Sequence, residues 1–385
     1  MDWPPTTTIL VALLAVVIVF ALLTAWHYRF WVRRLGQPVE YAERHDLRMP
    51  DGLPISLHRL APPDDPRTPP VLLVHGIASD HRNVDEREDR SLARHLHARG
   101  RDVWLLTLRS GQPGLSLRER ARVDFRSMVD HDLPRAIAFV LAQTQRPALD
   151  YVGFSMGGIL LYAALGRSLA SASLRRVATI GSPARVAPPI RALRVLGFLP
   201  RVVFRVVWLR MFARMGAFAV DALATPLHRQ VYNPHNVEPG AAGGALVNLI
   251  QDVPAPLSAD FAKWALGDGV IRVDGEDILA GLGEVEVPAL FIAGAVDNIA
   301  RPEAVRAAFE AWGRERDAVD KRFVVLGREQ GCAQDYGHGD LAIGERVEAE
   351  LFTPLADFLD ATADMVGSTH DRRGSGSQAQ GPATP

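Results

Sequence analysis

A serine flanked by small residues lies near the middle of the chain, in the stretch Gly153-Phe154-Ser155-Met156-Gly157. The stretch fits the pattern G-x-S-x-G, follows the apolar run LDYVGF and opens the apolar run MGGILLYAAL. A sharp turn from a strand into a helix needs small residues on both sides and leaves the serine hydroxyl free. We therefore predict Ser155 as a nucleophile for acyl transfer, in preference to a structural serine in a glycine-rich turn.

A serine hydroxyl is a poor nucleophile until a base takes its proton. His338 lies late in the chain in the stretch YGHGD, a glycine-flanked loop after the last predicted strand. His228 and His235 fall in a long interruption of the strand and helix pattern, and His370 lies in a polar tail. Open α/β sheets order these groups with serine first and histidine last, so we predict His338 as the base.

The base needs a carboxylate that holds the imidazole in one tautomer and stabilises its charged form. Asp297 follows the apolar run ALFIA, and loops at the carboxyl ends of strands build the sites of open α/β sheets. We predict Asp297 as this acid rather than as a cap of the following helix. Asp335 and Asp340 are the fallback candidates, but both lie too near His338 in sequence for the expected arrangement.

The oxyanion formed in acyl transfer needs two backbone N–H donors. The amide of Met156, directly after the nucleophile, is expected to be one of them. The amide of Ile77, in the stretch HGIA after the apolar run VLLV, is expected to be the other, and Gly76 gives the backbone room. His75 is interpreted as a structural histidine that braces this loop. The scattered histidines match no metal-binding motif, so neither a metal nor another cofactor is predicted.

Short apolar runs typical of strands alternate with helical patterns along most of the chain. The expected strands cover 46–49, 55–60, 71–74, 102–108, 149–154, 176–180, 289–293 and 322–326. The expected helices cover 86–99, 123–144, 156–169, 302–312 and 341–359. Such alternation predicts a mostly parallel sheet with helices on both faces.

The run from Ile9 to Trp26 contains no charged residue. As a helix it would span roughly 27 Å, about one bilayer core. A signal peptide would start with a basic region, whereas this chain starts MDWPP, so a retained membrane anchor is predicted. Arg29, Arg33 and Arg34 follow the run and no basic residue precedes it, which predicts a cytoplasmic catalytic domain.

The pattern divides the chain into segments with different expected roles. We expect residues 1–35 to form the anchor, 36–182 together with 286–365 the sheet domain, 183–285 a helical cap, and 366–385 a disordered tail. The cap interrupts the sheet between two strands and mixes large apolar residues with arginines.

Within this cap, Arg201 and Arg205, and likewise Arg210 and Arg214, are four residues apart, so each pair is expected to share a helical face. One interpretation is a lid that covers the site and touches lipid. The alternative is an ordinary capping subdomain whose arginines are solvated.

Composition excludes some functions. The chain has 385 residues, a net charge of −1 and 48% hydrophobic residues, so it can bury a large core and has no basic excess for a nucleic-acid partner. Its single cysteine, Cys332, excludes an internal disulfide.

From Val71 to about Leu359 the chain resembles the α/β-hydrolases, most closely their acid-lipase-like branch. The resemblance is carried by the stretches VLLVHGIASD, RDVWLLTLRSG and DFRSMVDHDLPRAIAFVLAQTQRPALDYVGFSMGG. It implies the α/β-hydrolase fold, with Ser155 as nucleophile, Asp297 as acid, His338 as base, and Ile77 and Met156 at the oxyanion hole.

Two features depart from that branch. Its serine motif usually reads GHSQG and here reads GFSMG, and an N-terminal anchor replaces the secretory signal of the animal lipases. The chain also resembles polyhydroxyalkanoate synthases more weakly. It differs from them at the nucleophile, because those enzymes carry cysteine where this chain has Ser155.

The sequence therefore predicts a membrane-anchored serine hydrolase that cleaves carboxyl esters of acyl lipids or other apolar molecules. An acyltransferase with the same three residues is the first alternative. A non-catalytic, membrane-tethered binding protein is the second.

Overall fold

The computed structural model describes residues 5–64, 68–187, 206–223 and 228–361. Its centre is an eight-stranded sheet with the order β1-β2-β4-β3-β5-β6-β11-β12. The β1–β2 and β2–β4 pairs are antiparallel, and all the other neighbours in this sheet are parallel. The predicted mostly parallel sheet is confirmed. The strands are β1 (Glu43–Arg48), β2 (Pro54–Arg59), β3 (Val71–Val74), β4 (Val103–Thr107), β5 (Leu149–Phe154), β6 (Leu174–Ile180), β11 (Ala289–Gly294) and β12 (Lys321–Leu326).

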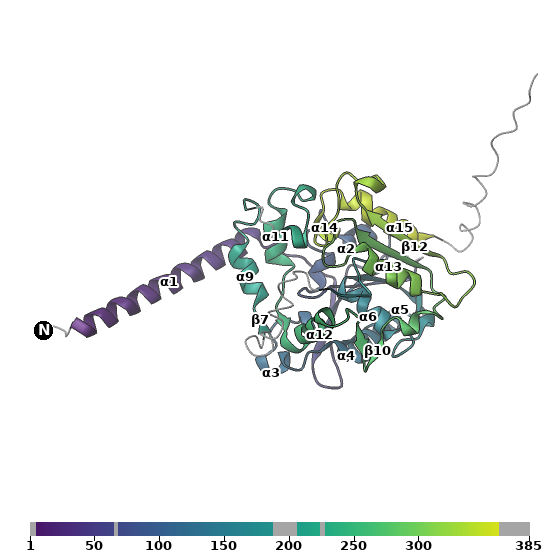
Figure 1. Ribbon diagram of the computed structural model, residues 1–385, viewed down its shortest axis with the longest axis horizontal. Coiled ribbons are helices and arrows are strands. Elements are labelled where there is room, and N and C mark those ends of the chain that lie inside the picture. Colours follow the sequence, from purple (N-terminus) through teal and green to yellow (C-terminus); the bar gives the residue numbers. More distant parts are fainter. Residues whose placement is uncertain (1–4, 65–67, 188–205, 224–227, 362–385) are drawn as a thin grey trace, which may run out of the picture.

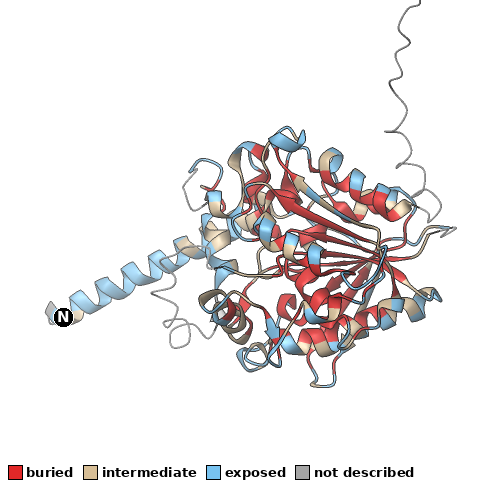
Figure 2. Cartoon of the chain, turned by 45° about the vertical axis from the view of Figure 1, so that its right-hand side comes forward, coloured by how far each residue is buried: buried red, intermediate tan, exposed pale blue. Residues whose placement is uncertain are grey.

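Helices cover both faces of this sheet, and apolar side chains fill the space on each side (Figure 2). Side chains of α4, α5, α6 and α13 belong to the core on one face, and those of α2, α14 and α15 to the core on the other. The central strands are buried on both faces, as parallel strands between two helical layers must be. The helices are α2 (Leu92–Ala98), α3 (Leu117–Arg120), α4 (Phe125–Ser127), α5 (Leu133–Thr144), α6 (Met156–Ala164), α13 (Pro302–Ala311), α14 (Asp340–Ile343) and α15 (Thr353–Asp360).

Three helices differ from their predicted bounds. The helix expected over 86–99 begins only at Leu92, because Ser91 caps its N-terminus by accepting a hydrogen bond from the Arg94 amide at 3.0 Å. The helix expected over 156–169 ends at Ala164, where the backbone turns extended. The helix expected over 341–359 is two helices separated at Gly344.

The insertion, which we define as residues 183–285, lies between β6 and β11. Its described elements are short helices and two small two-stranded sheets rather than helices alone. From Val253 onward it does not behave as a separate cap, because Trp264, Ile271 and Ile278 join the main core and Trp264 packs on Phe125 at 5.2 Å. The elements are β7 (Val206–Val207), α9 (Leu209–Gly216), α10 (His228–Val231), α11 (Ala241–Asn248), β8 (Val253–Pro254), α12 (Ala255–Leu266), β9 (Arg272–Val273) and β10 (Glu276–Asp277).

The N-terminal helix α1 (Pro5–Leu35) projects away from the rest of the molecule (Figure 1). Its apolar part is fully exposed, and it is long and apolar enough to cross a membrane, with a mean hydropathy of 3.0. Its last turns lie against α9 and α11 (Figure 1). The predicted pair Arg201 and Arg205 and the predicted disordered tail over 366–385 lie outside the described residues.

Candidate active site

Ser155 occupies the turn between β5 and α6, at the carboxyl end of the central strand. Its backbone has φ 50° and ψ −113°, a strained conformation for a residue with a side chain. Glycine is required on both sides of it. A Cβ on Gly153 would lie 2.5 Å from the Gly158 amide nitrogen, and one on Gly157 would lie 2.4 Å from the Val74 carbonyl oxygen. These close approaches explain why a strand-to-helix turn of this shape needs the G-x-S-x-G pattern.

Ser155, His338 and Asp297 form a continuous chain of hydrogen bonds. Ser155 Oγ and His338 Nε2 are 3.0 Å apart, and His338 Nδ1 and Asp297 Oδ2 are 2.7 Å apart. A neutral imidazole protonated at Nδ1 donates to the carboxylate and accepts from the serine hydroxyl. The structure thus brings together the three side chains that were predicted from separate parts of the sequence.

Asp297 is held by the loop that follows β11. Its Oδ1 accepts hydrogen bonds from the amides of Ile299 at 2.8 Å and Ala300 at 2.7 Å, which leaves Oδ2 directed at His338. The fallback acids serve elsewhere. Asp335 accepts from the Arg328 amide at 2.9 Å, and Asp340 accepts from the Gly337 amide at 2.9 Å.

Asp340 fixes the loop that carries His338, a role that local sequence patterns do not indicate. Its buried carboxylate also accepts from the side chain of Asn236 at 2.8 Å and from the Asn233 amide at 3.2 Å, both in the insertion. Burial raises the pKa of Asp340 to about 6. The Gly339 amide donates to the Val231 carbonyl at 2.7 Å. The insertion therefore forms hydrogen bonds with the histidine loop at several points.

The predicted oxyanion loop lies directly against Ser155. A Cβ on Gly76 would be only 3.1 Å from Ser155 Cβ, so glycine lets the backbone between β3 and Ile77 approach the serine. The side chain of Asn83 accepts from the Gly76 amide at 2.9 Å and holds the loop in place. Met156 is fully buried as the first residue of α6, and its amide is one of the N–H groups that have no partner within a helix.

His75 braces this loop, as predicted. Its Nδ1 donates to the Gly76 carbonyl at 2.7 Å, and its Nε2 accepts from the Leu108 amide at 3.1 Å. Complete burial lowers the pKa of His75 to about 4, so the ring is neutral at physiological pH and fits this donor and acceptor pair.

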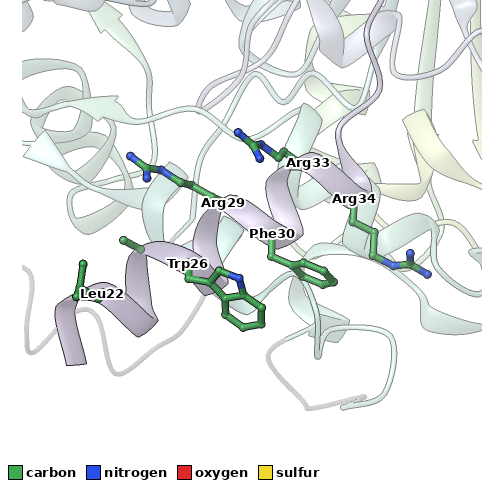
Figure 3. Close-up of a pocket in the computed structure, with 7 residues that line it drawn as sticks. Leu22, Trp26, Arg29, Phe30, Arg33 and Arg34 are labelled. Carbon is green, nitrogen blue, oxygen red and sulfur yellow. The ribbon is translucent and has the colours of Figure 1, made fainter. Parts of the chain in front are cut away.

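The site residues are nearly closed off from solvent. Ser155 is 5% exposed and His338 is 9% exposed. A cavity lined in part by Asn83, Phe154 and Leu341 has a volume of only about 10 Å³. A larger hollow, of about 740 Å³, is lined by α1 residues alone and includes none of the site residues (Figure 3). Among the described residues, no group of three or more His, Cys, Asp or Glu is arranged to hold a metal ion.

The fold and this site define a class of protein. Residues 69–326 match the family model described as the alpha/beta hydrolase fold. This match spans well over half of the chain, so the chain belongs to the alpha/beta hydrolase family.

Three known proteins show what the chain is similar to. A protein of Schizosaccharomyces pombe described as a probable lipase is 28% identical over 138 residues, which is 32% of this chain and 30% of that protein. The structure resembles a membrane phospholipase A described as a bacterial virulence factor, with TM-score 0.52, 18% identity and coverage of 92% of this chain and 96% of that chain. It also resembles the enol-lactonase of Burkholderia xenovorans, with TM-score 0.51, 17% identity and coverage of 82% and 100%.

Proposed function

We propose that the protein is a membrane-anchored serine hydrolase that cleaves carboxyl esters, with Ser155, His338 and Asp297 as its catalytic residues. The observation that carries the proposal is the hydrogen-bonded chain from Ser155 Oγ through the imidazole to Asp297. This chain supplies a nucleophile, a base and a group that orients the base in one tautomer.

In the first half of the reaction, Ser155 Oγ attacks the ester carbonyl carbon while His338 Nε2 takes the hydroxyl proton. The carbonyl oxygen becomes an oxyanion, which the amides of Ile77 and Met156 stabilise. The imidazolium, stabilised by Asp297, gives its proton to the leaving alcohol oxygen as the carbon–oxygen bond breaks. The acyl group is then esterified to Ser155.

In the second half, His338 takes a proton from water, and the hydroxide oxygen attacks the acyl carbon. The oxyanion forms again at the same donors, and its collapse returns the proton from His338 to Ser155 Oγ. The carboxylic acid leaves, and the free enzyme is restored.

Apolar esters at a membrane are the proposed substrates. The exposed apolar side chains Leu209, Met211 and Phe212 lie on α9, the helix that packs beside α1. Such side chains are suited to the boundary between lipid headgroups and acyl chains. The likeness to a probable lipase points to the same class of substrate.

We further propose that α1 is a retained anchor with the catalytic domain on the cytoplasmic side. The Arg214 side chain donates to the Tyr28 hydroxyl at 3.2 Å, and the ring of Phe218 packs edge-on against His27 at 4.9 Å. Removal of α1 by cleavage would uncover these contacts. Digestion of sealed inverted vesicles by added protease tests the orientation. If the catalytic domain is cytoplasmic, it lies on the outside of these vesicles and should be digested.

A fluorophosphonate probe tests the chemistry, because it reacts with activated serines. We expect labelling of the full-length protein in detergent micelles and no labelling of Ser155→Ala. Ser168→Ala is the control and should be labelled normally, because the Ser168 hydroxyl of the wild type donates to the Val129 carbonyl and is not part of the site. Absence of labelling in folded wild-type protein would refute the proposal.

The substrate class is tested with p-nitrophenyl esters of increasing acyl length. An apolar-ester enzyme should prefer medium or long acyl chains, because each buried methylene adds about 0.8 kcal/mol of binding. A strict preference for acetate would reject the lipid-ester assignment. Product analysis with and without an added alcohol distinguishes hydrolysis from acyl transfer.

A further inference from the structure

An open cavity, different from the two described above, lies where α1 meets the rest of the protein. It has a volume of about 360 Å³ and is bounded by the end of α1, the loop after β3, and α9 and α11 of the insertion. Three arginines, Arg82, Arg210 and Arg214, contribute to its lining, together with one carboxylate, that of Asp80. We call this cavity the arginine pocket.

Two of these arginines are held in place by carbonyl groups rather than by carboxylates. Arg82 donates to the Gln37 carbonyl at 2.7 Å, and Arg214 donates to the Val247 carbonyl at 3.0 Å. These contacts position the guanidinium groups without neutralising them. Among the described residues, no ion pair joins the three guanidinium groups to a carboxylate, although Asp252 lies close by: it pairs with Arg120 at 3.5 Å and accepts from the backbone amide of Arg210 at 3.1 Å.

Arg210 is the least satisfied of the three. Its Nε is buried and has no hydrogen-bond partner among the described residues. A buried charged donor of this kind is costly unless an acceptor reaches it. Burial and the neighbouring charge of Arg214 lower its pKa, and these effects outweigh the opposing ones of Asp252 and Asp80.

Asp80 offsets only part of this positive charge, because one carboxylate carries one negative charge. Its carboxylate accepts from the Arg82 amide at 2.9 Å and from the side chain of Gln251 at 2.7 Å. Asp252 is the second carboxylate near Arg210, and it is also paired with Arg120, so arginines outnumber carboxylates around the pocket. The arginine pocket therefore keeps a net positive potential and suits an anion with several acceptor oxygens.

The position of the arginine pocket along α1 indicates where such an anion would come from. The aromatic side chains of Trp26, Phe30 and Trp31 lie near the end of the apolar run, where aromatic residues mark a membrane interface. Val32 and Gly36, which line the pocket, lie within about one to two helical turns beyond them, at roughly 5 Å per turn. This is the depth of lipid headgroups.

We propose that the arginine pocket binds the phosphate of an anionic phospholipid headgroup. The proposal rests on α1 crossing the membrane, as set out above, but not on the catalytic assignment. Arginine binds phosphate oxygens through paired, charge-assisted hydrogen bonds, and basic pockets beside membrane helices on the cytoplasmic side suit anionic headgroups. The same chemistry would accept free phosphate, so the test includes both sources.

The test uses the full chain in neutral detergent micelles, with Ser155→Ala in every sample so that no lipid is consumed. Native mass spectrometry counts bound phosphatidylglycerol, with phosphatidylcholine as the neutral comparison. Arg210→Gln is the pocket variant, because the buried Nε of Arg210 has no hydrogen-bond partner among the described residues. Arg34→Gln is the matched control, because Arg34 is exposed near the same end of α1 and lines a different hollow (Figure 3).

We expect one phosphatidylglycerol bound per protein, an affinity about tenfold weaker in Arg210→Gln, and no change in Arg34→Gln. Equal losses in both variants would indicate diffuse attraction and overturn the proposal, as would an unchanged affinity in Arg210→Gln. Inorganic phosphate is added as a competitor. If it displaces the lipid at equal concentration, the site is one for free phosphate and the lipid assignment fails. Because catalysis is disabled throughout, none of these outcomes depends on the proposed esterase activity.

Discussion

His338 Nδ1 lies 2.7 Å from Asp297 Oδ2, while the other oxygen of Asp297 accepts from two backbone amides. An asparagine at position 297 can keep the amide contacts through its oxygen, but its NH₂ group would then face Nδ1. The imidazole would have to carry its proton on Nε2, where it cannot accept the proton of Ser155. We therefore expect Asp297→Asn to fold normally and to lose on the order of 10⁴-fold in kcat for p-nitrophenyl butyrate.

Asp335→Asn is the control for that variant, because the Asp335 side chain accepts from the Arg328 amide instead of contacting His338. Its rate should stay within about threefold of the wild type, as a change remote from the chemistry would give. If Asp335→Asn loses activity and Asp297→Asn keeps it, the acid is misassigned.

The bond between Asn83 and the Gly76 amide leads to a second prediction. Asn83→Ala removes the acceptor that holds the oxyanion loop beside Ser155. We expect kcat to fall by about 10- to 100-fold with little change in KM, because the loop contacts the substrate most strongly in the transition state. Steady-state kinetics on one p-nitrophenyl ester separates the two constants. A raised KM with an unchanged kcat would show that Asn83 serves substrate binding instead.

The crowding at Gly157 predicts a loss of stability. A Cβ there would lie 2.4 Å from the Val74 carbonyl oxygen, so Gly157→Ala must displace α6 from β3. We expect the free energy of unfolding to fall by about 1–3 kcal/mol. Unfolding on heating or in denaturant can be measured by intrinsic fluorescence. Gly216→Ala is the matched control, because nothing lies within 4 Å of its added methyl group. A control that is as unstable as Gly157→Ala would contradict this explanation.

The positions of the site residues were predictable because they follow from local patterns. Ser155 follows a run of buried apolar residues, and Asp297 and His338 lie in loops after later strands. Parallel strands bring such loops to one edge of a sheet, so chain order alone indicated that the three residues meet. The glycines on both sides of Ser155 gave further support, because a sharp strand-to-helix turn needs small residues there.

The supporting contacts were not predictable in the same way. Asn236 and Asp340 are 104 residues apart in sequence, and their bond forms only because the insertion folds back over the histidine loop. Helix ends such as Ala164 depend on tertiary contacts that periodicity does not report. Likewise, the sequence predicts that the segment around Trp264 belongs to a helical cap, yet Trp264 packs into the main core.

Asp80 predicts how stability depends on pH. Burial raises its pKa from 3.8 to about 6, and the charged and ionisable groups that face it are Arg82, Arg210 and Tyr41. A raised folded-state pKa means that the native protein binds a proton more tightly than the unfolded chain. The stabilising contribution is therefore complete below about pH 4 and is lost as pH rises through 6, up to about 3 kcal/mol.

Asp80→Asn removes this titration and keeps the geometry. The asparagine oxygen still accepts from the Arg82 amide, and the Gln251 amide can turn over to present its oxygen to the new NH₂ group. Relative to the wild type, the variant should gain about 1–3 kcal/mol between pH 4 and pH 8, because only the wild type has a buried carboxyl group to ionise over that range. Thermal unfolding of both proteins at matched ionic strength measures this difference. If the two curves stay parallel across that range, Asp80 ionises as freely in the folded protein as in the unfolded chain, and the arginine pocket then faces an ionised carboxylate over most of that range.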